Sequence, residues 1–167
     1  MAAGSTYTPI ATTTLGSNQA SVTFSGISGS YTDLIIWTNA ANTAGNAAIK
    51  VQVGNSSIDT GSNYSTTYLY GNGSTATSGR TTSATSMIAA RTASTLTANG
   101  YITLQNYSNT TTYKTMLSRG NAANEMAVAY VGLWRSTSAI NIITLTDENA
   151  NNFISGSTFT LYGIAAA

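Results

Sequence analysis

The sequence contains no histidine and no cysteine, and these two absences exclude most familiar catalytic and metal sites. A Ser-His-Asp or Cys-His nucleophile needs an imidazole, and structural zinc sites need thiolates or imidazoles. Without cysteine the chain also forms no disulfide bond. We therefore expect a protein that is not an enzyme and that holds no cofactor or transition metal.

Charged residues are scarce as well. Six Lys and Arg stand against five Asp and Glu, so that 7% of the 167 residues are charged, whereas about 25% is usual. A net charge of +1 is too small to neutralise a run of phosphates, which argues against a nucleic-acid partner. No segment approaches the roughly 20 apolar residues of a membrane span, and Met1–Thr6 lacks the basic and apolar regions of a secretory leader. We expect a chain made in the cytoplasm that binds neither nucleic acid nor membrane.

The few acidic residues form no convincing site. The adjacent Asp147 and Glu148 would point to opposite faces of an extended segment, whereas glycoside hydrolysis needs two carboxyl groups at one cleft. Asp147–Asn151 has the Asp-x-Asn-x-Asn start of a calcium loop, but Asn152 and Thr158 occupy the positions of its glycine and its final acid. We interpret the segment as a turn between strands, with calcium binding as the alternative.

Small polar residues dominate what remains, since Ser, Thr and Asn account for 67 of the 167 residues. Apolar residues alternate with them at a period of two almost throughout, which predicts strands. About ten strands at spacings of roughly 8 to 15 residues are typical of an antiparallel β-sandwich. The sequence therefore predicts an all-β protein with one domain over residues 9–167, preceded by an extended arm over residues 1–8. The Gly/Ser/Thr-rich stretch 71–82 is predicted to be a surface loop.

Two of the predicted strands, Asp33–Trp37 and Val128–Trp134, are apolar on both faces. A two-layer sandwich buries only one face of each sheet, so the second face needs a cover. One interpretation is that a loop or the N-terminal arm of the same subunit covers it. The other is a homo-oligomeric interface rich in Trp and Tyr.

Tyrosines and arginines supply the remaining candidates. Tyr64, Tyr68 and Tyr70 share one strand face, where they form either an aromatic platform for a sugar or protein contact, or half of an ordinary core. Four arginines can pair with the few acids or reach a neighbouring subunit through bidentate hydrogen bonds, namely Arg80, Arg91, Arg119 and Arg135. The candidate partner or self-association contacts are Tyr7, Trp37, Tyr64, Tyr68, Tyr70, Arg80, Trp134 and Arg135.

Three segments, residues 68–74 (YLYGNGS), 132–140 (GLWRSTSAI) and 155–164 (SGSTFTLYGI), resemble small virion structural proteins of tailed bacteriophages, particularly phages of cyanobacteria and aquatic bacteria. Residues 7–15 and 31–34 fit the same pattern. The resemblance implies a β-sandwich of jelly-roll type in the virion, either on the capsid exterior as a decoration (cement) protein or on the tail.

From this resemblance we expect a capsid decoration protein that self-associates, with a trimer favoured, and that bridges neighbouring major capsid protein subunits. The arm and the 71–82 loop are the expected lattice contacts. The alternative is a tail-fibre or receptor-binding module that recognises host surface glycans through Tyr64, Tyr68 and Tyr70.

Overall fold

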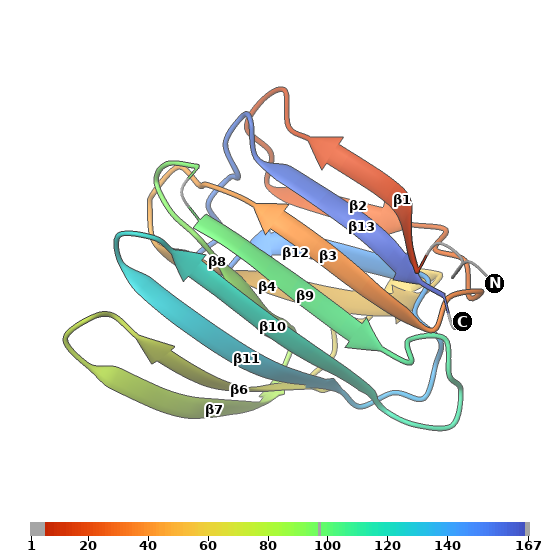
Figure 1. The fold of residues 1–167 in the computed structure, drawn as a ribbon. Helices are drawn as coiled ribbons and strands as arrows, with labels where there is room; N and C mark the ends of the chain where they lie inside the picture. The colour runs from red at the N-terminus through yellow and green to blue at the C-terminus, as the bar shows by residue number, and fades with distance from the viewer. Residues whose placement is uncertain (1–5, 97, 166–167) are drawn as a thin grey trace.

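The computed structural model of the chain describes residues 6–96 and 98–165, and these residues form strands without helices. Thirteen strands occur in this part of the chain (Figure 1). Their bounds are β1 (Tyr7–Thr14), β2 (Ser21–Ser25), β3 (Asp33–Asn39), β4 (Ala47–Asn55), β5 (Ser57–Ile58), β6 (Tyr64–Gly71), β7 (Ala76–Ala84), β8 (Met87–Thr92), β9 (Ala98–Gln105), β10 (Lys114–Ala122), β11 (Met126–Trp134), β12 (Ile142–Asp147) and β13 (Thr158–Ile164).

The strands form two sheets that pack face to face. One has eight strands in the order β1-β13-β3-β9-β10-β11-β6-β7, and the other has the order β2-β12-β4-β5 with β8 also pairing with β4. All pairings between these strands are antiparallel. The first strands pair with the last ones, β1 with β13 and β2 with β12, so the chain closes on itself in a jelly-roll-like sandwich. The prediction of an all-β sandwich is confirmed.

The stretch 71–82, predicted to be a surface loop, is instead largely a strand. β7 pairs with β6 as the edge of the eight-stranded sheet, and only a short turn separates the two strands. The Asn72 Oδ1 atom closes this turn by accepting hydrogen bonds from the backbone N–H groups of Ser74 and Thr75 at 3.1 and 2.8 Å. The prediction was wrong because an edge strand with little burial needs no apolar alternation, and this alternation was the signal used.

The predicted arm is shorter than expected. Tyr7 and Thr8 already belong to β1, where they pair with Ile164 and Gly163 of β13. Residues 1–5 of the arm lie outside the described residues.

Glycines allow the two sheets to approach closely at β8. A Cβ atom on Gly120 of β10 would lie 2.9 Å from Cα of Ala90, and one on Gly100 of β9 would lie 2.7 Å from the Ala90 Cβ. Side chains of the eight-stranded sheet also satisfy the backbone of β8: the N–H group of Ala90 donates to Ser118 Oγ at 3.0 Å, and that of Ile88 donates to Thr66 Oγ1 at 3.0 Å. β8 is therefore fixed against β9, β10 and β11 by packing, and to β10 and β6 by hydrogen bonds.

Candidate functional site

The two outer faces of the sandwich differ in chemistry. The outer face of the five-stranded sheet carries polar side chains such as Thr23, Thr144 and Gln52, and the hydroxyl groups of Thr23 and Thr144 lie 2.9 Å apart. The outer face of the eight-stranded sheet leaves large apolar side chains in solvent. Because surface strands usually alternate apolar-in with polar-out, this second face is the unusual one.

The strand register assembles this surface from segments far apart in the sequence. One row runs across β3, β9, β10, β11 and β6 through Trp37, Tyr101, Arg119, Ala129 and Leu69. The neighbouring row on the same face is Ile35, Thr103, Leu117, Val131 and Thr67. We call these two rows the apolar face.

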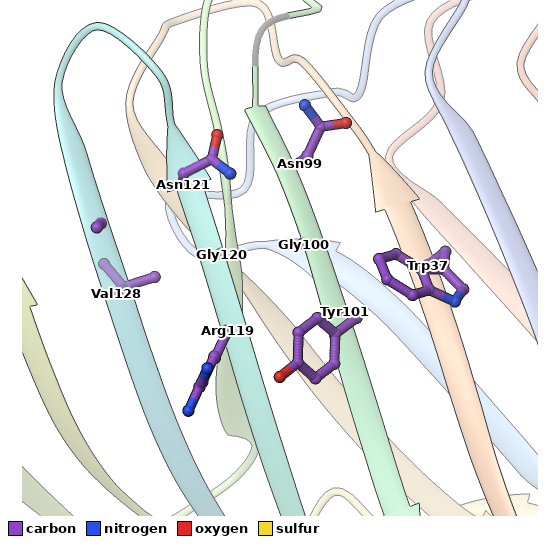
Figure 2. A pocket seen from close by; sticks show the side chains of 9 residues that line it. Trp37, Asn99, Gly100, Tyr101, Arg119, Gly120, Asn121 and Val128 are labelled. Atoms are coloured by element: carbon purple, nitrogen blue, oxygen red, sulfur yellow. The ribbon is translucent and has the colours of Figure 1, made fainter.

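Three neighbours on β3, β9 and β10 of the apolar face have distinctive chemistry, namely Trp37, Tyr101 and Arg119, and Figure 2 shows them on adjacent strands. The rings of Trp37 and Tyr101 have centroids 5.4 Å apart. Arg119 lies beside Tyr101, and its guanidinium has no hydrogen-bond or ion-pair partner within the part of the chain that the structure describes. Trp, Tyr and Arg are the residue types that contribute most to protein interfaces.

Shallow hollows lie on both sides of Arg119. One, of about 300 Å³, is bordered by Trp37, Tyr101 and Arg119 and extends over Gly100 and Gly120. The other, of about 450 Å³, lies toward Leu69 and is bordered by Ala127 and Ala129. The small side chains of Ala127 and Ala129 on β11 therefore leave space between Arg119 and Leu69. Another molecule could place a side chain there.

The structure tests what covers the outward apolar side of the segments Asp33–Trp37 and Val128–Trp134. Trp37 and Val131 are each 51% exposed, and Leu69 is 57% exposed. No loop among residues 6–96 and 98–165 covers them, so the interpretation of a covering loop from the same subunit was wrong for this part of the chain. The alternative that the N-terminal arm covers this side falls largely outside the described residues, since residues 1–5 are not described. The homo-oligomeric interface remains a prediction.

The other candidate contacts are distributed differently. Tyr7 is exposed on β1 and packs edge-on against Tyr162 with ring centroids 6.5 Å apart. Arg80 is exposed on β7, and its Nε donates to Thr67 Oγ1 at 3.2 Å, so it borders the apolar face. Trp37 thus belongs to the apolar face, Arg80 lies at its rim next to β6, and Tyr7 lies on the opposite edge strand of the sheet.

Trp134 and Arg135 both bind groups within the chain. Trp134 is 3% exposed, and its Nε1 donates to Asp59 Oδ2 at 2.7 Å. Burial alone would raise the pKa of the Asp59 carboxyl, but hydrogen bonds from Trp134, Asn63 and Gly61 lower it overall. Arg135 donates to the carbonyl oxygens of Ser62 and Tyr64, both at 3.2 Å. Both side chains therefore hold the segment before β6. The prediction of a partner contact was wrong for the buried Trp134, and for the half-buried Arg135 it stays a prediction.

The predicted tyrosine platform divides between the core and the surface. Tyr64 is completely buried, and its hydroxyl donates to the carbonyl oxygens of Val53 and Asp59, at 2.9 and 2.8 Å. Burial raises the pKa of Tyr64 to about 12. Tyr64 is therefore a core residue, while Tyr68 and Tyr70 are only half-buried.

Tyr68 and Tyr70 line a second site together with Tyr130. β8 packs mainly over β9, β10 and β11, so the inner side of β6 is covered at Tyr64 and Thr66 and is left partly open at Tyr68 and Tyr70. A cleft of about 250 Å³ opens there, lined by Ala48, Tyr68, Tyr70, Thr81, Ile88, Arg91, Tyr130 and Glu148. We call it the tyrosine cleft.

The Asp147 turn has an internal structural role. The Asp147 carboxylate is buried and accepts hydrogen bonds from Asn42 Nδ2 at 2.6 Å, the Asn149 N–H at 2.9 Å and Asn151 Nδ2 at 3.1 Å. Its oxygens therefore already bind the protein's own donors. Glu148 is exposed, so the pair does not face one cleft. Among the described residues no group of three or more acidic side chains is placed to hold a metal ion.

Sequence reasoning missed Tyr101 and Tyr130 as site residues. It considered Arg91 and Arg119 only among the arginines that could pair with an acid or reach a neighbouring subunit, and it considered Glu148 only as half of a carboxylate pair. Alternation could place Tyr101 and Arg119 on the outer sides of their own strands. Nothing local indicates that β3, β9 and β10 are neighbours, and only that pairing brings Tyr101 and Arg119 beside Trp37.

Comparisons with known proteins give no family. No family model matches the sequence, and no curated protein matches it. Among solved structures, the fold has a weak similarity to SCLam, a non-specific endo-β-1,3(4)-glucanase from family GH16, with a TM-score of 0.26 and 10% identity. The match covers 81% of this chain and 58% of the glucanase chain. The described residues contain no helix long and apolar enough to cross a membrane.

Proposed function

We propose that this chain is a non-enzymatic virion structural protein of a tailed phage, which attaches to other proteins through the apolar face. In this proposal it is a decoration protein on the capsid exterior that self-associates, as a trimer, and bridges neighbouring major capsid protein subunits. The observation that carries the docking role is the group of exposed Trp37, half-buried Tyr101 and exposed Arg119, which lies on a sheet face that also exposes Leu69, Leu117 and Val131. The virion assignment rests on the three segments that resemble phage structural proteins.

The size of the surface agrees with a docking role. The whole outer face of the eight-stranded sheet, of which the apolar face is about half, measures about 750 Å², because its strands lie about 4.8 Å apart and are about 20 Å long. A specific interface of standard size buries about 800 Å² on each partner. Because the central part of this face carries few charges, association should depend little on ionic strength. Many weakly bound copies on one lattice would reinforce one another through multivalency.

Trp37 provides the direct test. About 125 Å² of this side chain is in solvent, and its complete coverage would stabilise a contact by about 3 kcal/mol. We expect Trp37→Ala to weaken self-association about 100-fold, measured by sedimentation equilibrium, and to remove the chain from virion heads in a particle map. The fold should be retained, since the indole ring is half exposed.

Tyr113→Ala is the matched control, because Tyr113 is 55% exposed and lies outside the apolar face. It should leave association and head occupancy unchanged. Equal effects of Trp37→Ala and Tyr113→Ala, or a wild-type chain that stays monomeric and absent from heads, would contradict the proposal.

A further inference from the structure

The tyrosine cleft lies on the opposite side of the eight-stranded sheet from the apolar face. Tyr68 and Tyr70 point inward from β6, and Tyr130 points inward from the neighbouring strand β11. The cleft exists because eight strands are packed against a narrower sheet. A protein docked on the outer face would leave the cleft open.

The aromatic side chains of the cleft are held in a fixed arrangement. The rings of Tyr68 and Tyr70 are within 19° of parallel, with centroids 6.1 Å apart, and the ring of Tyr130 lies 6.4 Å from that of Tyr68. Gly79 on β7 leaves the room that the Tyr68 ring occupies, since a Cβ atom there would lie 2.6 Å from Tyr68 Cζ. The rings are therefore ordered before any ligand arrives, which lowers the entropy cost of binding.

The polar groups of the cleft carry one positive and one negative charge. Glu148 Oε2 accepts a hydrogen bond from the Ala48 N–H at 3.3 Å, which leaves the rest of this exposed carboxylate accessible. Arg91 donates to Asn46 Oδ1, and its positive charge lies close enough to the Tyr130 hydroxyl to oppose the rise in the pKa of Tyr130 that burial causes. The Nε of Arg91 is buried and has no hydrogen-bond partner in the described part of the chain.

These features define the ligand class. Because one positive and one negative side chain line the cleft, it disfavours a phosphate or another strongly ionic group. Arg91 can donate hydrogen bonds and Glu148 can accept them, which suits a ligand that carries hydroxyl groups. Tyrosine rings offer flat surfaces to the C–H groups of a ring-shaped ligand. We propose that the tyrosine cleft binds a neutral sugar ring, as the terminal unit of a glycan would present it. The site does not depend on docking through the apolar face.

The test is an NMR titration of the full-length, ¹⁵N-labelled chain with the methyl glycosides of glucose, galactose, mannose and N-acetylglucosamine. We expect one of these probes to shift the backbone signals of Tyr68, Ile88 and Arg91, with a dissociation constant of about 1 mM. Tyr68→Ala should weaken binding at least tenfold. Glu148→Gln, which retains an oxygen for the Ala48 N–H, should weaken it severalfold without disturbing the fold.

Two controls separate this inference from the proposed function. Tyr113→Ala and Trp37→Ala should both leave glycoside binding unchanged, even if Trp37→Ala abolishes association. Adenosine monophosphate serves as the anionic probe, and we expect it not to bind. The inference is overturned if none of the four glycosides shifts the cleft signals at about 50 mM, if the Tyr68→Ala and Glu148→Gln variants bind as well as wild type, or if the nucleotide binds more tightly than every glycoside.

Discussion

Gly120→Ala tests how the close contact between the sheets supports the fold. The new methyl group would lie 2.9 Å from Cα of Ala90, 3.2 Å from its carbonyl carbon and 3.1 Å from the backbone nitrogen of Arg91. These atoms are backbone and cannot rotate away, so β8 has to shift. The shift would also strain the hydrogen bond from the Ala90 N–H to Ser118 Oγ, which is 3.0 Å long.

The expected cost follows from two opposing contributions. Overpacking of a buried contact costs about 1–3 kcal/mol, and removal of a strand glycine returns about 0.5–1 kcal/mol through the lower entropy of the unfolded chain. The net destabilisation is about 1–2 kcal/mol, which for a domain of this size lowers Tm by about 2–8 °C. Because β8 carries Arg91 and Ile88, binding in the tyrosine cleft should weaken in the same variant.

Chemical denaturation and thermal melting followed by circular dichroism measure this effect. Gly16→Ala is the matched control, because a Cβ atom there meets nothing within 4 Å and the backbone is not left-handed. That variant should be as stable as wild type or more stable, by up to about 1 kcal/mol. If Gly120→Ala is no less stable than Gly16→Ala, then the close approach of β8 does not constrain the sandwich as described.

Two further predictions concern buried polar groups. Trp134→Phe removes the donor to Asp59 Oδ2, so we expect a loss of about 2 kcal/mol in unfolding free energy at neutral pH. The loss should shrink in acid, because the lowered pKa of Asp59 stabilises the fold only above that pKa; an equal loss at all pH values would contradict this reasoning. The unfolded chain releases the Tyr64 proton near pH 10 and the folded chain near pH 12. Stability should therefore fall by about 2–3 kcal/mol as pH rises through this range. Urea denaturation across the range should show a smaller fall in Tyr64→Phe, and equal falls in the two proteins would refute the assignment.

The two tryptophans show how far sequence reasoning reaches. Alternation correctly places Trp37 on the opposite side of its strand from Leu34 and Ile36, and Trp134 on the same side as Val128 and Tyr130. Because both strands are apolar on both sides, the pattern does not say which side faces solvent. The sandwich decides this, since the inward side meets the second sheet. Trp134 is buried there and Trp37 is left exposed.

The tyrosines of β6 show the same limit. Tyr64, Tyr68 and Tyr70 share one face of the strand, as the alternation predicts, yet only Tyr64 is fully buried. The difference arises from where the second sheet ends, which depends on the number and pairing of strands elsewhere in the chain. β7 was missed for a related reason, because an exposed edge strand is held by backbone hydrogen bonds to β6 and carries no apolar signal of its own.

The amino-acid sequence alone determines that this protein is built from strands, that it lacks imidazole and thiol chemistry, and that two strands carry more apolar surface than one core can cover. These are local properties of residue type and alternation. The tertiary structure alone decides that Trp37, Tyr101 and Arg119 are neighbours and that Tyr68, Tyr130 and Arg91 share a cleft. Strand pairing and sheet packing join residues that are distant in the chain, and the period of two is the same for every possible partner strand.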